Sequence, residues 1–343
     1  MSEVVSVIIN NKKFTGWETI HITSSLDAAA QTFDIGLLNT HETHEIIPGQ
    51  LCKILIDDEV VLTGYIGRRG RKISASEKSM FITGRDKIGD LIDCSIEKKS
   101  GTWRNVTILD IASEICKPFG ISVSMGKDAS PGDKFTKFSL QDGETAFSLI
   151  ERLCRQRALL PISTPEGNLL LDVPRSTYAD DALVYGSNIK VIDELIDYDV
   201  RFSTYTVKSQ NDGGGDSWSA STVTGLKGTA KDKALSRYRP LVMHSESKGS
   251  LASLKKRAAW EAVVRFGRSL SYTIVTPTWK QTSRALWKRN MLVDLICEDL
   301  SLDGTFIISG VTYTLTPAEG HNTTLTLRHQ DAYTPNPSGE IAP

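Results

Sequence analysis

Little in this sequence points to secretion or to a membrane. Its 343 residues contain five cysteines, an odd number, and no two of them form a CxxC pair. They are Cys52, Cys94, Cys116, Cys154 and Cys297. Such a scattered set favours a reducing compartment. The start lacks a basic segment followed by an apolar one, and no apolar run approaches the ~18 residues that span a bilayer. We therefore expect folding in the cytoplasm and no transmembrane segment.

An excess of charge of either sign is also missing. The chain has 40 basic and 41 acidic residues and a formal net charge of −1, so no global field attracts it to nucleic acid or to an anionic membrane. Hydrophobic residues at 40% and charged residues at 24% are typical of a folded protein. The length predicts two or three domains.

Signatures of catalysis are absent as well. The segment from Gly120 to Lys127 has one residue too many for a phosphate loop, and Asp128 stands where a magnesium-binding Ser or Thr belongs. The run 41–45, His-Glu-Thr-His-Glu, spaces its histidines by three instead of four, so we expect a solvated loop before Pro48. No G-x-S-x-G elbow occurs. We expect no catalytic residues, no cofactor, no metal and no small-molecule substrate, hence not an enzyme; an undetected hydrolase stays an alternative.

What the sequence does have is many short strand patterns separated by turn signals such as Asn10-Asn11 and Asp57-Asp58. In the first part we expect strands at 4–9, 19–23, 32–38, 51–56, 60–66 and 79–83. From about 190 we expect strands at 201–208, 241–244, 270–275, 291–297, 305–309, 311–315 and 323–328. A helix at about 250–266 interrupts the second set, and a Gly- and Ser-rich stretch at about 211–228 is expected to be a mobile loop.

Between the two β-rich parts the apolar period becomes helical. Ile108, Ile111 and Ile115 recur at helical spacing after a Thr107-x-x-Asp110 cap signal, and a second helix is expected from about Asp142. We predict an α+β, β-dominated fold with a small inserted α/β module. The predicted domains are a first β-barrel-like unit at 1–95, the module at 96–190, and a second β-barrel-like unit at 191–343.

The two β units look like copies of each other. In each, an apolar strand (51–56 or 291–296) is followed by an acidic turn and a strand that ends at Thr63-Gly64-Tyr65 or Ser309-Gly310-Val311. A polar hairpin and an alternating strand follow, and the last strand closes on Arg85-Asp86 or on 328–331. Any two β-meanders share part of this pattern, but the matched order favours a duplication. Three copies of such a chain would supply six similar units to a ring.

Several short motifs, in this order and spacing, resemble one family. They are Phe14-Thr15-Gly16-Trp17, Gly64-Tyr65-Ile66, Gly84-Arg85-Asp86-Lys87, Tyr205-Thr206-Val207-Lys208, Lys227-Gly228-Thr229-Ala230 and Arg237-Tyr238-Arg239-Pro240. Over nearly its whole length the chain resembles the baseplate hub proteins of Mu-like contractile-tailed phages and prophages, and more distantly the hub subunit of T-even phages.

The resemblance implies a homotrimer whose two barrel-like domains per subunit alternate around a pseudo-sixfold ring. Such a ring joins the six-fold tail tube to a trimeric central spike, contacts other baseplate proteins, and leaves an axial passage for genomic DNA. The family is structural, so the resemblance carries over no catalytic residues. It implies assembly in the host cytoplasm and a final place in the baseplate of the virion tail. A hub-like component of another contractile injection machine is the alternative.

One basic run is a candidate contact for nucleic acid or for the lumen of the ring. It consists of Arg68, Arg69, Arg71 and Lys72. Clustered cations displace counterions from phosphates, so a nucleic-acid-binding module is a second class of function. The alternative is a solvated hairpin edge that its charges protect against further pairing. We favour the edge, because one short run in a neutral chain makes few phosphate contacts.

Overall fold

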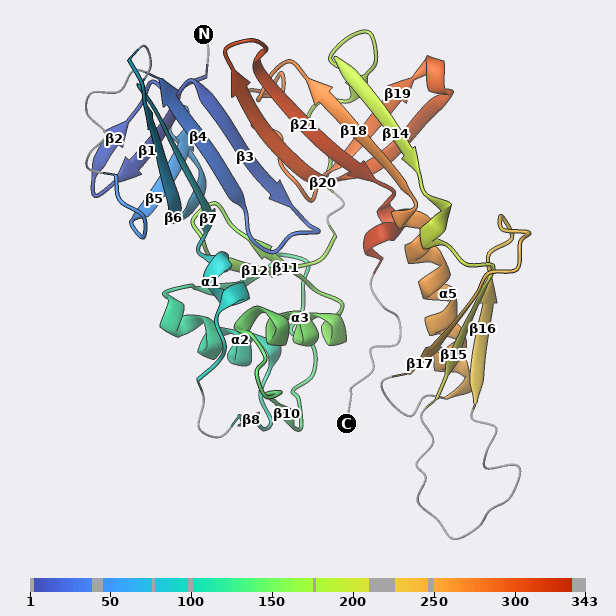
Figure 1. The fold of residues 1–343 in the computed structure, drawn as a ribbon. Helices are drawn as coiled ribbons and strands as arrows, with labels where there is room; N and C mark the ends of the chain where they lie inside the picture. Colours follow the sequence, from blue (N-terminus) through green and yellow to red (C-terminus); the bar gives the residue numbers. More distant parts are fainter. Residues whose placement is uncertain are drawn as a thin grey trace.

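The computed structural model describes residues 3–38, 46–75, 78–97, 101–174, 177–209, 226–245 and 250–334. Strands dominate, as predicted, and 13 of them form one sheet that runs through both β units. The main path through this sheet is β14-β18-β21-β20-β3-β4-β7-β6-β5-β1-β2. Figure 1 shows the blue strands of the first unit beside the orange and red strands of the second, with the α/β module beneath the first.

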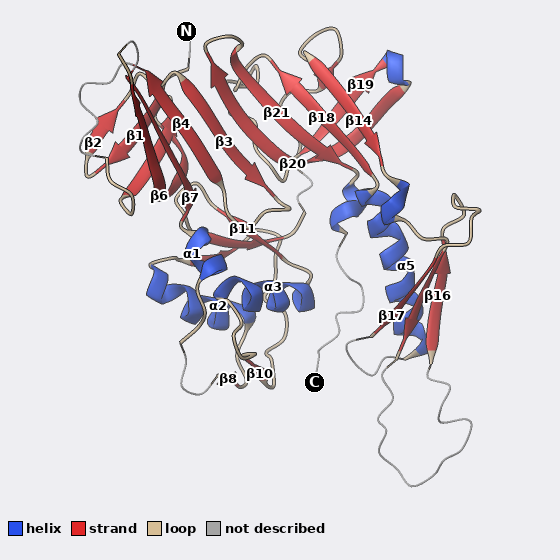
Figure 2. Ribbon diagram, viewed as in Figure 1, coloured by secondary structure: helices blue, strands red, loops and turns tan. Residues whose placement is uncertain are grey.

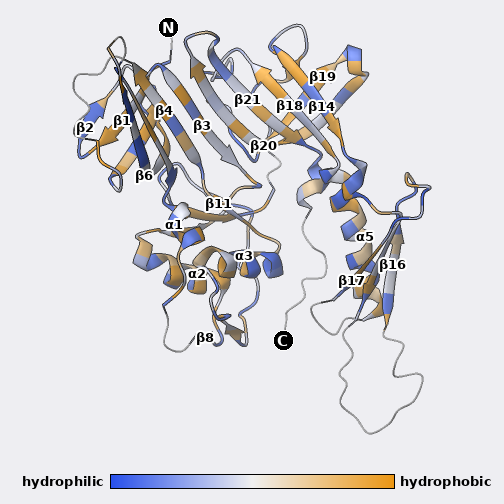
Figure 3. Ribbon diagram, in the orientation of Figure 1, coloured by the Kyte–Doolittle hydropathy of each residue, from blue (hydrophilic) through white to orange (hydrophobic). Residues whose placement is uncertain are grey.

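The first unit contains seven strands. They are β1 Val5–Ile9, β2 Lys12–Phe14, β3 Thr19–Ser25, β4 Thr32–Leu38, β5 Leu51–Ile56, β6 Glu59–Ile73 and β7 Lys78–Asp86. Hydrophobic and polar residues alternate along several of them (Figure 3), because one face of the sheet covers a core and the other meets water. Strand β6 is seven residues longer at its end than the predicted 60–66, since it continues through the basic run to Ile73.

Six more strands of this sheet come from the second part of the chain, the first of them from the end of the segment predicted as the module. They are β13 Leu183–Val184, β14 Val191–Ile196, β18 Leu270–Thr276, β19 Leu292–Cys297, β20 Leu302–Thr316 and β21 Gly320–Arg328. The two strands predicted at 305–309 and 311–315 are one continuous strand, β20, with a β-bulge between Ile308 and Gly310. A bulge lets a long strand bend without ending.

The same strand order occurs in both units, in line with the predicted repeat. The order β3-β4-β7-β6-β5 in the first unit recurs as β14-β18-β21-β20-β19 in the second. Both units contain a meander of strands with 6, 15 and 9 residues. The N–H of Gly49 donates to the carbonyl of Ile66 at 2.7 Å, and the N–H of Asn290 donates to that of Ile308 at 2.8 Å. Gly49 and Asn290 share a positive φ.

The strand register corrects one detail of the repeat. Leu51 pairs with Tyr65, which pairs with Arg85, and Leu292 pairs with Ile307, which pairs with Arg328. Arg85 and Arg328 are therefore equivalent, as the sequence pattern indicated. Gly64, however, is equivalent to Phe306 and not to Gly310, so the match between the two glycine motifs was wrong.

The units are joined edge to edge by antiparallel pairing of β3 with β20. The sequence pattern did not predict this connection. Closure of each unit into a barrel, and the division at residues 95 and 190, stay predictions.

The α/β module has its own hydrophobic core. Its elements are α1 Ile88–Asp93, β8 Thr102–Trp103, α2 Ile108–Cys116, η2 Lys117–Phe119, β9 Val123–Met125, β10 Phe138–Ser139, α3 Ala146–Arg157, β11 Leu160–Ser163 and β12 Leu169–Asp172. Thr107 caps α2 as predicted: its side chain accepts from the Asp110 N–H, and the Asp110 carboxylate accepts from the Thr107 N–H. Helix α3 starts four residues later than expected, because Thr145 is its cap.

A third small body lies within the second unit. It comprises β15 Thr204–Lys208, β16 Lys227–Lys231, β17 Pro240–His244 and α5 Leu251–Arg268, which is the helix expected at 250–266. Its three strands form a separate sheet with a small core against α5. The remaining short helices are η3 Tyr198–Val200, η4 Glu298–Leu300 and η5 Gln330–Tyr333. Lys227 and Gly228 are in β16, whereas 211–225 of the predicted mobile loop lie outside the described residues.

In the ranges that the structure describes, no helix is both long enough and apolar enough to cross a bilayer.

The close contact of β6 with β7 at Gly64 leads to a testable prediction. A Cβ at Gly64 would lie 2.0 Å from the Arg85 carbonyl oxygen and 2.4 Å from the Asp86 Cα, whereas a Cβ at Gly67 would meet nothing nearer than 3.6 Å. We expect Gly64→Ala to lower the free energy of unfolding by about 2 kcal/mol or more, because backbone atoms must move. Gly67→Ala, the control on the same strand, should change it by less than about 0.5 kcal/mol. Equal stabilities of the two variants in urea unfolding would contradict the described packing.

Candidate functional site

The predicted basic run lies on one strand edge. Arg68, Arg69, Arg71 and Lys72 occupy β6 beyond its bulge and pair with β7. Strand β5 covers only the first part of β6, as far as Tyr65. The Arg69 guanidinium donates to the Ile46 carbonyl, while Arg68 and Lys72 are exposed. The run is thus part of a hairpin edge, and its contact with nucleic acid stays a prediction.

The other candidates from sequence give no site. Within the described part of the chain, no group of three or more His, Cys, Asp or Glu side chains could hold a metal ion. The His-Glu-Thr-His-Glu run at 41–45 lies outside that part. Gly120 ends η2 and leads into β9, so no helix N-terminus is available there to hold a phosphate. Burial raises the pKa of Cys52 and Cys116 to about 12, so these thiols stay protonated at neutral pH.

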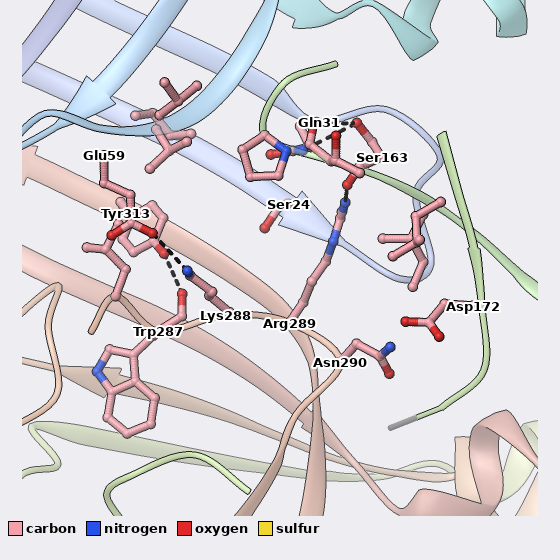
Figure 4. A pocket seen from close by; sticks show the side chains of 18 residues that line it. Ser24, Gln31, Glu59, Ser163, Asp172, Trp287, Lys288, Arg289, Asn290 and Tyr313 are labelled. Carbon is pink, nitrogen blue, oxygen red and sulfur yellow. Dashed lines mark hydrogen bonds and ion pairs between the residues drawn. The ribbon is translucent and has the colours of Figure 1, made fainter. Parts of the chain in front are cut away.

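A pocket lies where the two β units and the α/β module meet. Figure 4 shows the side chains that line it. They include Ile22 of β3, Val61 of β6, Tyr313 of β20, Ile162 of β11 and Leu170 of β12, together with the segment 286–290. At its rim the Lys288 ammonium and the Glu59 carboxylate form an ion pair at 2.8 Å. The lining is therefore drawn from three parts of the chain that are far apart in sequence.

Two charged groups hold this junction together. The buried Asp86 carboxylate accepts hydrogen bonds from the Gln31 N–H at 2.9 Å, the Ile88 N–H at 3.1 Å and the Ser163 hydroxyl. From the second unit, the Arg289 guanidinium donates to the Ser163 carbonyl at 2.6 Å (Figure 4) and to the Ser25 carbonyl at 2.8 Å. Ser163 of the module thus contacts both groups.

The electrostatics of the pair follow from burial. Desolvation raises the pKa of Asp86, although its three hydrogen bonds and the charge of Arg289 oppose this. Desolvation lowers the pKa of Arg289 to about 10, against the attraction of Asp86. Arg289 therefore remains charged at neutral pH. Asp86 and Ser163 are 1% and 3% exposed, and their hydrogen bonds go to other parts of the chain, so we assign them to positioning the three parts.

Sequence reasoning missed this network. Asp86 was noted only as the close of a repeat and as part of a family motif, and Arg289 was not singled out. The one available signal was a carboxylate at the end of an apolar strand, directly before a helix.

Asp86→Asn tests the network. The amide has one acceptor oxygen for three donors, so we expect the free energy of unfolding to fall by about 1–3 kcal/mol. The exposed Asp142→Asn is the matched control. The pKa of Asp86 is raised above its ordinary 3.8 in the folded state. Its stabilisation is therefore complete below 3.8 and is lost as pH rises through the raised pKa.

The advantage of the wild type over Asp86→Asn in urea unfolding should thus be largest near pH 4 and shrink toward pH 7. An advantage that grows with pH would show that attraction to Arg289 outweighs desolvation.

Comparison with known proteins covers most of the chain. Residues 4–86 match the family described as Mu phage baseplate assembly protein GpP-like, N-terminal. Residues 88–173 match the second domain of baseplate hub protein gp44-like proteins, and 250–336 match the fourth domain of the Mu phage baseplate assembly protein GpP.

Individual relatives agree with these matches. The chain is 32% identical to baseplate hub protein gp44 of Escherichia phage Mu, over 97% of this chain and 89% of that protein. The 43 kDa tail protein of prophage MuSo2 from Shewanella oneidensis is 32% identical with a TM-score of 0.86, covering 96% of this chain and all of that one. A tail protein from Neisseria meningitidis MC58 is 25% identical with a TM-score of 0.83, covering 98% and 99%. The chain therefore belongs to the phage baseplate hub protein family that includes the hub protein of phage Mu.

Proposed function

We propose that this chain is the structural hub of a contractile-tail baseplate, acting as a homotrimeric ring. In this role it joins the six-fold tail tube to a trimeric central spike, contacts other baseplate proteins, and leaves an axial passage for genomic DNA. It would assemble in the host cytoplasm and reside in the baseplate of the virion tail.

One observation carries the proposal: the chain contains the same strand unit twice, with the two copies joined side by side in one sheet. Three such chains supply six similar units, which is the number that a six-fold tube requires, while keeping the threefold symmetry that a trimeric spike requires. Membership of the hub family supports the same assignment.

The proposed action is mechanical and needs no catalysis. The two β units, 1–95 and 191–343, would form the ring, and the inserted module at 96–190 would face outward or toward other baseplate proteins. The Asp86–Ser163–Arg289 network supports these separate roles for the β units and the module, because it fixes the module to both units.

The mass in solution tests the ring. Light scattering of the purified chain over a wide concentration range should give three times its 37.7 kDa. A mass that stays monomeric at every concentration would contradict the ring and favour a binding module.

Duplex DNA binding tests the second class of function. A passage for DNA calls for weak contact, so a gel shift in ~0.15 M salt should show little binding, unchanged when Arg68, Arg69, Arg71 and Lys72 become alanine. The control variant replaces the exposed Lys255 and Lys256 of α5. Tight binding that weakens steeply with salt and is lost only in the first variant would instead favour the nucleic-acid-binding module.

A further inference from the structure

One motif of the family resemblance, Arg237-Tyr238-Arg239-Pro240, has no part in the strand repeat or in the junction pocket. It lies in the loop 232–239 and at the start of the strand that follows, between β16 and β17 of the small third body. Figure 1 shows this body apart from the α/β module. Its three-stranded sheet is separate from the 13-stranded sheet, so the loop lies outside the pairing that joins the two β units.

Tyr238 is exposed to an unusual degree. At 93% it is the most exposed of the large hydrophobic side chains in the described part of the chain. Within that part its ring and hydroxyl make no hydrogen bond and no contact with another ring or a cation. Single exposed apolar residues are common on protein surfaces, so exposure alone assigns no role. What distinguishes Tyr238 is the loop that carries it.

A buried ion pair fixes the first end of this loop. The Arg201 guanidinium donates to both carboxylate oxygens of Asp232, at 2.8 and 2.9 Å, and the two side chains are 6% and 9% exposed. Asp232 also accepts from the Ala234 N–H at 3.0 Å, and Leu235 is buried. Because a bidentate pair fixes geometry as well as charge, the start of the loop is held in one conformation.

Arg239 fixes the second end of the loop. Its N–H donates to the Ser203 hydroxyl at 3.0 Å, and its carbonyl accepts from the Ser203 N–H at 2.8 Å. Its guanidinium donates to the carbonyl of Arg201 at 3.0 Å and to that of Asp199 at 2.6 Å. The loop is therefore attached at both ends to the same short segment of the chain, 199–203.

A fixed loop that presents an exposed aromatic ring is suited to a protein interface. Tyrosine and arginine are enriched among the residues that dominate binding energy. A tyrosine has few rotatable bonds, and a loop that is already fixed loses little entropy when it binds. The neighbouring Arg237 lies 3.5 Å from Asp199, but these side chains are 60% and 85% exposed, so their ion pair contributes little to the fold. Tyr238 and Arg237 are thus both available to a partner.

The charge around Tyr238 indicates the chemistry of that partner. Lys233 and Arg237 are exposed on the loop. The Asp232 carboxylate is buried in its own ion pair, and Asp199 pairs only weakly with Arg237. The surface beside Tyr238 is therefore basic, and a partner surface that carries carboxylates complements it.

We propose that Tyr238 anchors a protein–protein contact, in which its ring enters an apolar pocket of another baseplate protein and Arg237 pairs with a carboxylate at the edge of that pocket. This proposal rests on the proposed hub function and specifies one contact of the hub. The loop lies outside the sheet that joins the two β units, so we assign the contact to a different protein and not to a second copy of this chain.

Chemical nitration tests whether Tyr238 becomes covered. The chain would be expressed with the tail and baseplate proteins of the same phage genome, and the resulting particles and the purified chain would each be treated with tetranitromethane. Mass spectrometry gives the nitration rate of each tyrosine. We expect Tyr238 to react about tenfold or more slowly in the particles than in the purified chain, because the anchor of an interface is desolvated. The buried Tyr205 and Tyr313 should react slowly in both samples.

The outcomes separate this contact from the hub function. If the chain is present in the particles and Tyr238 reacts as fast there as in the purified chain, the anchor is wrong and the hub function stands. Protection of Tyr238 already in the purified chain would show that a second copy covers it, which overturns the assigned partner. A chain that stays monomeric and is absent from the particles would overturn the hub function itself.

Substitutions separate binding from folding. Tyr238→Ala should lower the amount of chain recovered in the particles by about tenfold or more, whereas Tyr238→Phe, which keeps the ring, should retain most of it. The matched control is Tyr178→Ala, which removes a side chain that is 51% exposed elsewhere in the chain. Tyr238→Ala should unfold in urea as the wild type does, since the side chain makes no contacts that stabilise the fold. Wild-type recovery of Tyr238→Ala, or a loss that follows lower stability, would contradict the anchor.

Discussion

The pairing of β3 with β20 is the interaction on which the rest of the structure depends. It turns two sheets into one, because β20 pairs with β19 through residues 302–307 and with β3 through residues 310–315. Backbone hydrogen bonds between strands are directional, and a shift by one residue would move every side chain to the wrong face. The two units are therefore held in a defined relation that a loop could not provide.

Much of this fold could be predicted from local pattern. The strand alternation, the cap at Thr107 and the helix near 250–266 are encoded by neighbouring residues, so they were found. The pairing of β3 with β20 was not found, because the two strands lie almost the whole chain apart. The sequence of an edge strand also does not show which other strand it pairs with. The small body around β15 was missed since its strands are separated by long intervals. The match of Gly64 with Gly310 was wrong, because a Ser/Thr-Gly pair does not by itself fix the alignment of two strands. The match of Arg85 with Arg328 was right, since both lie at equivalent positions of their strands.

The candidate sites also differ in how far the sequence could reveal them. A cluster of exposed cations is visible in any sequence, so the run on β6 was found although its role was open. Asp86, Ser163 and Arg289 give no such signal, because buried polar residues have no periodicity and their partners come from three parts of the chain. Removing one member leaves a desolvated group without a partner, which is why so few atoms can keep the module aligned with both units.

The distribution of charge over the sheet has a consequence for contacts between copies. Residues 68–73 of β6 are basic, whereas β14 is acidic. Like charges on directly opposed strands repel each other, so each of these strands disfavours pairing with the same strand of another copy. The charge pattern thus protects the sheet against aggregation of identical strands.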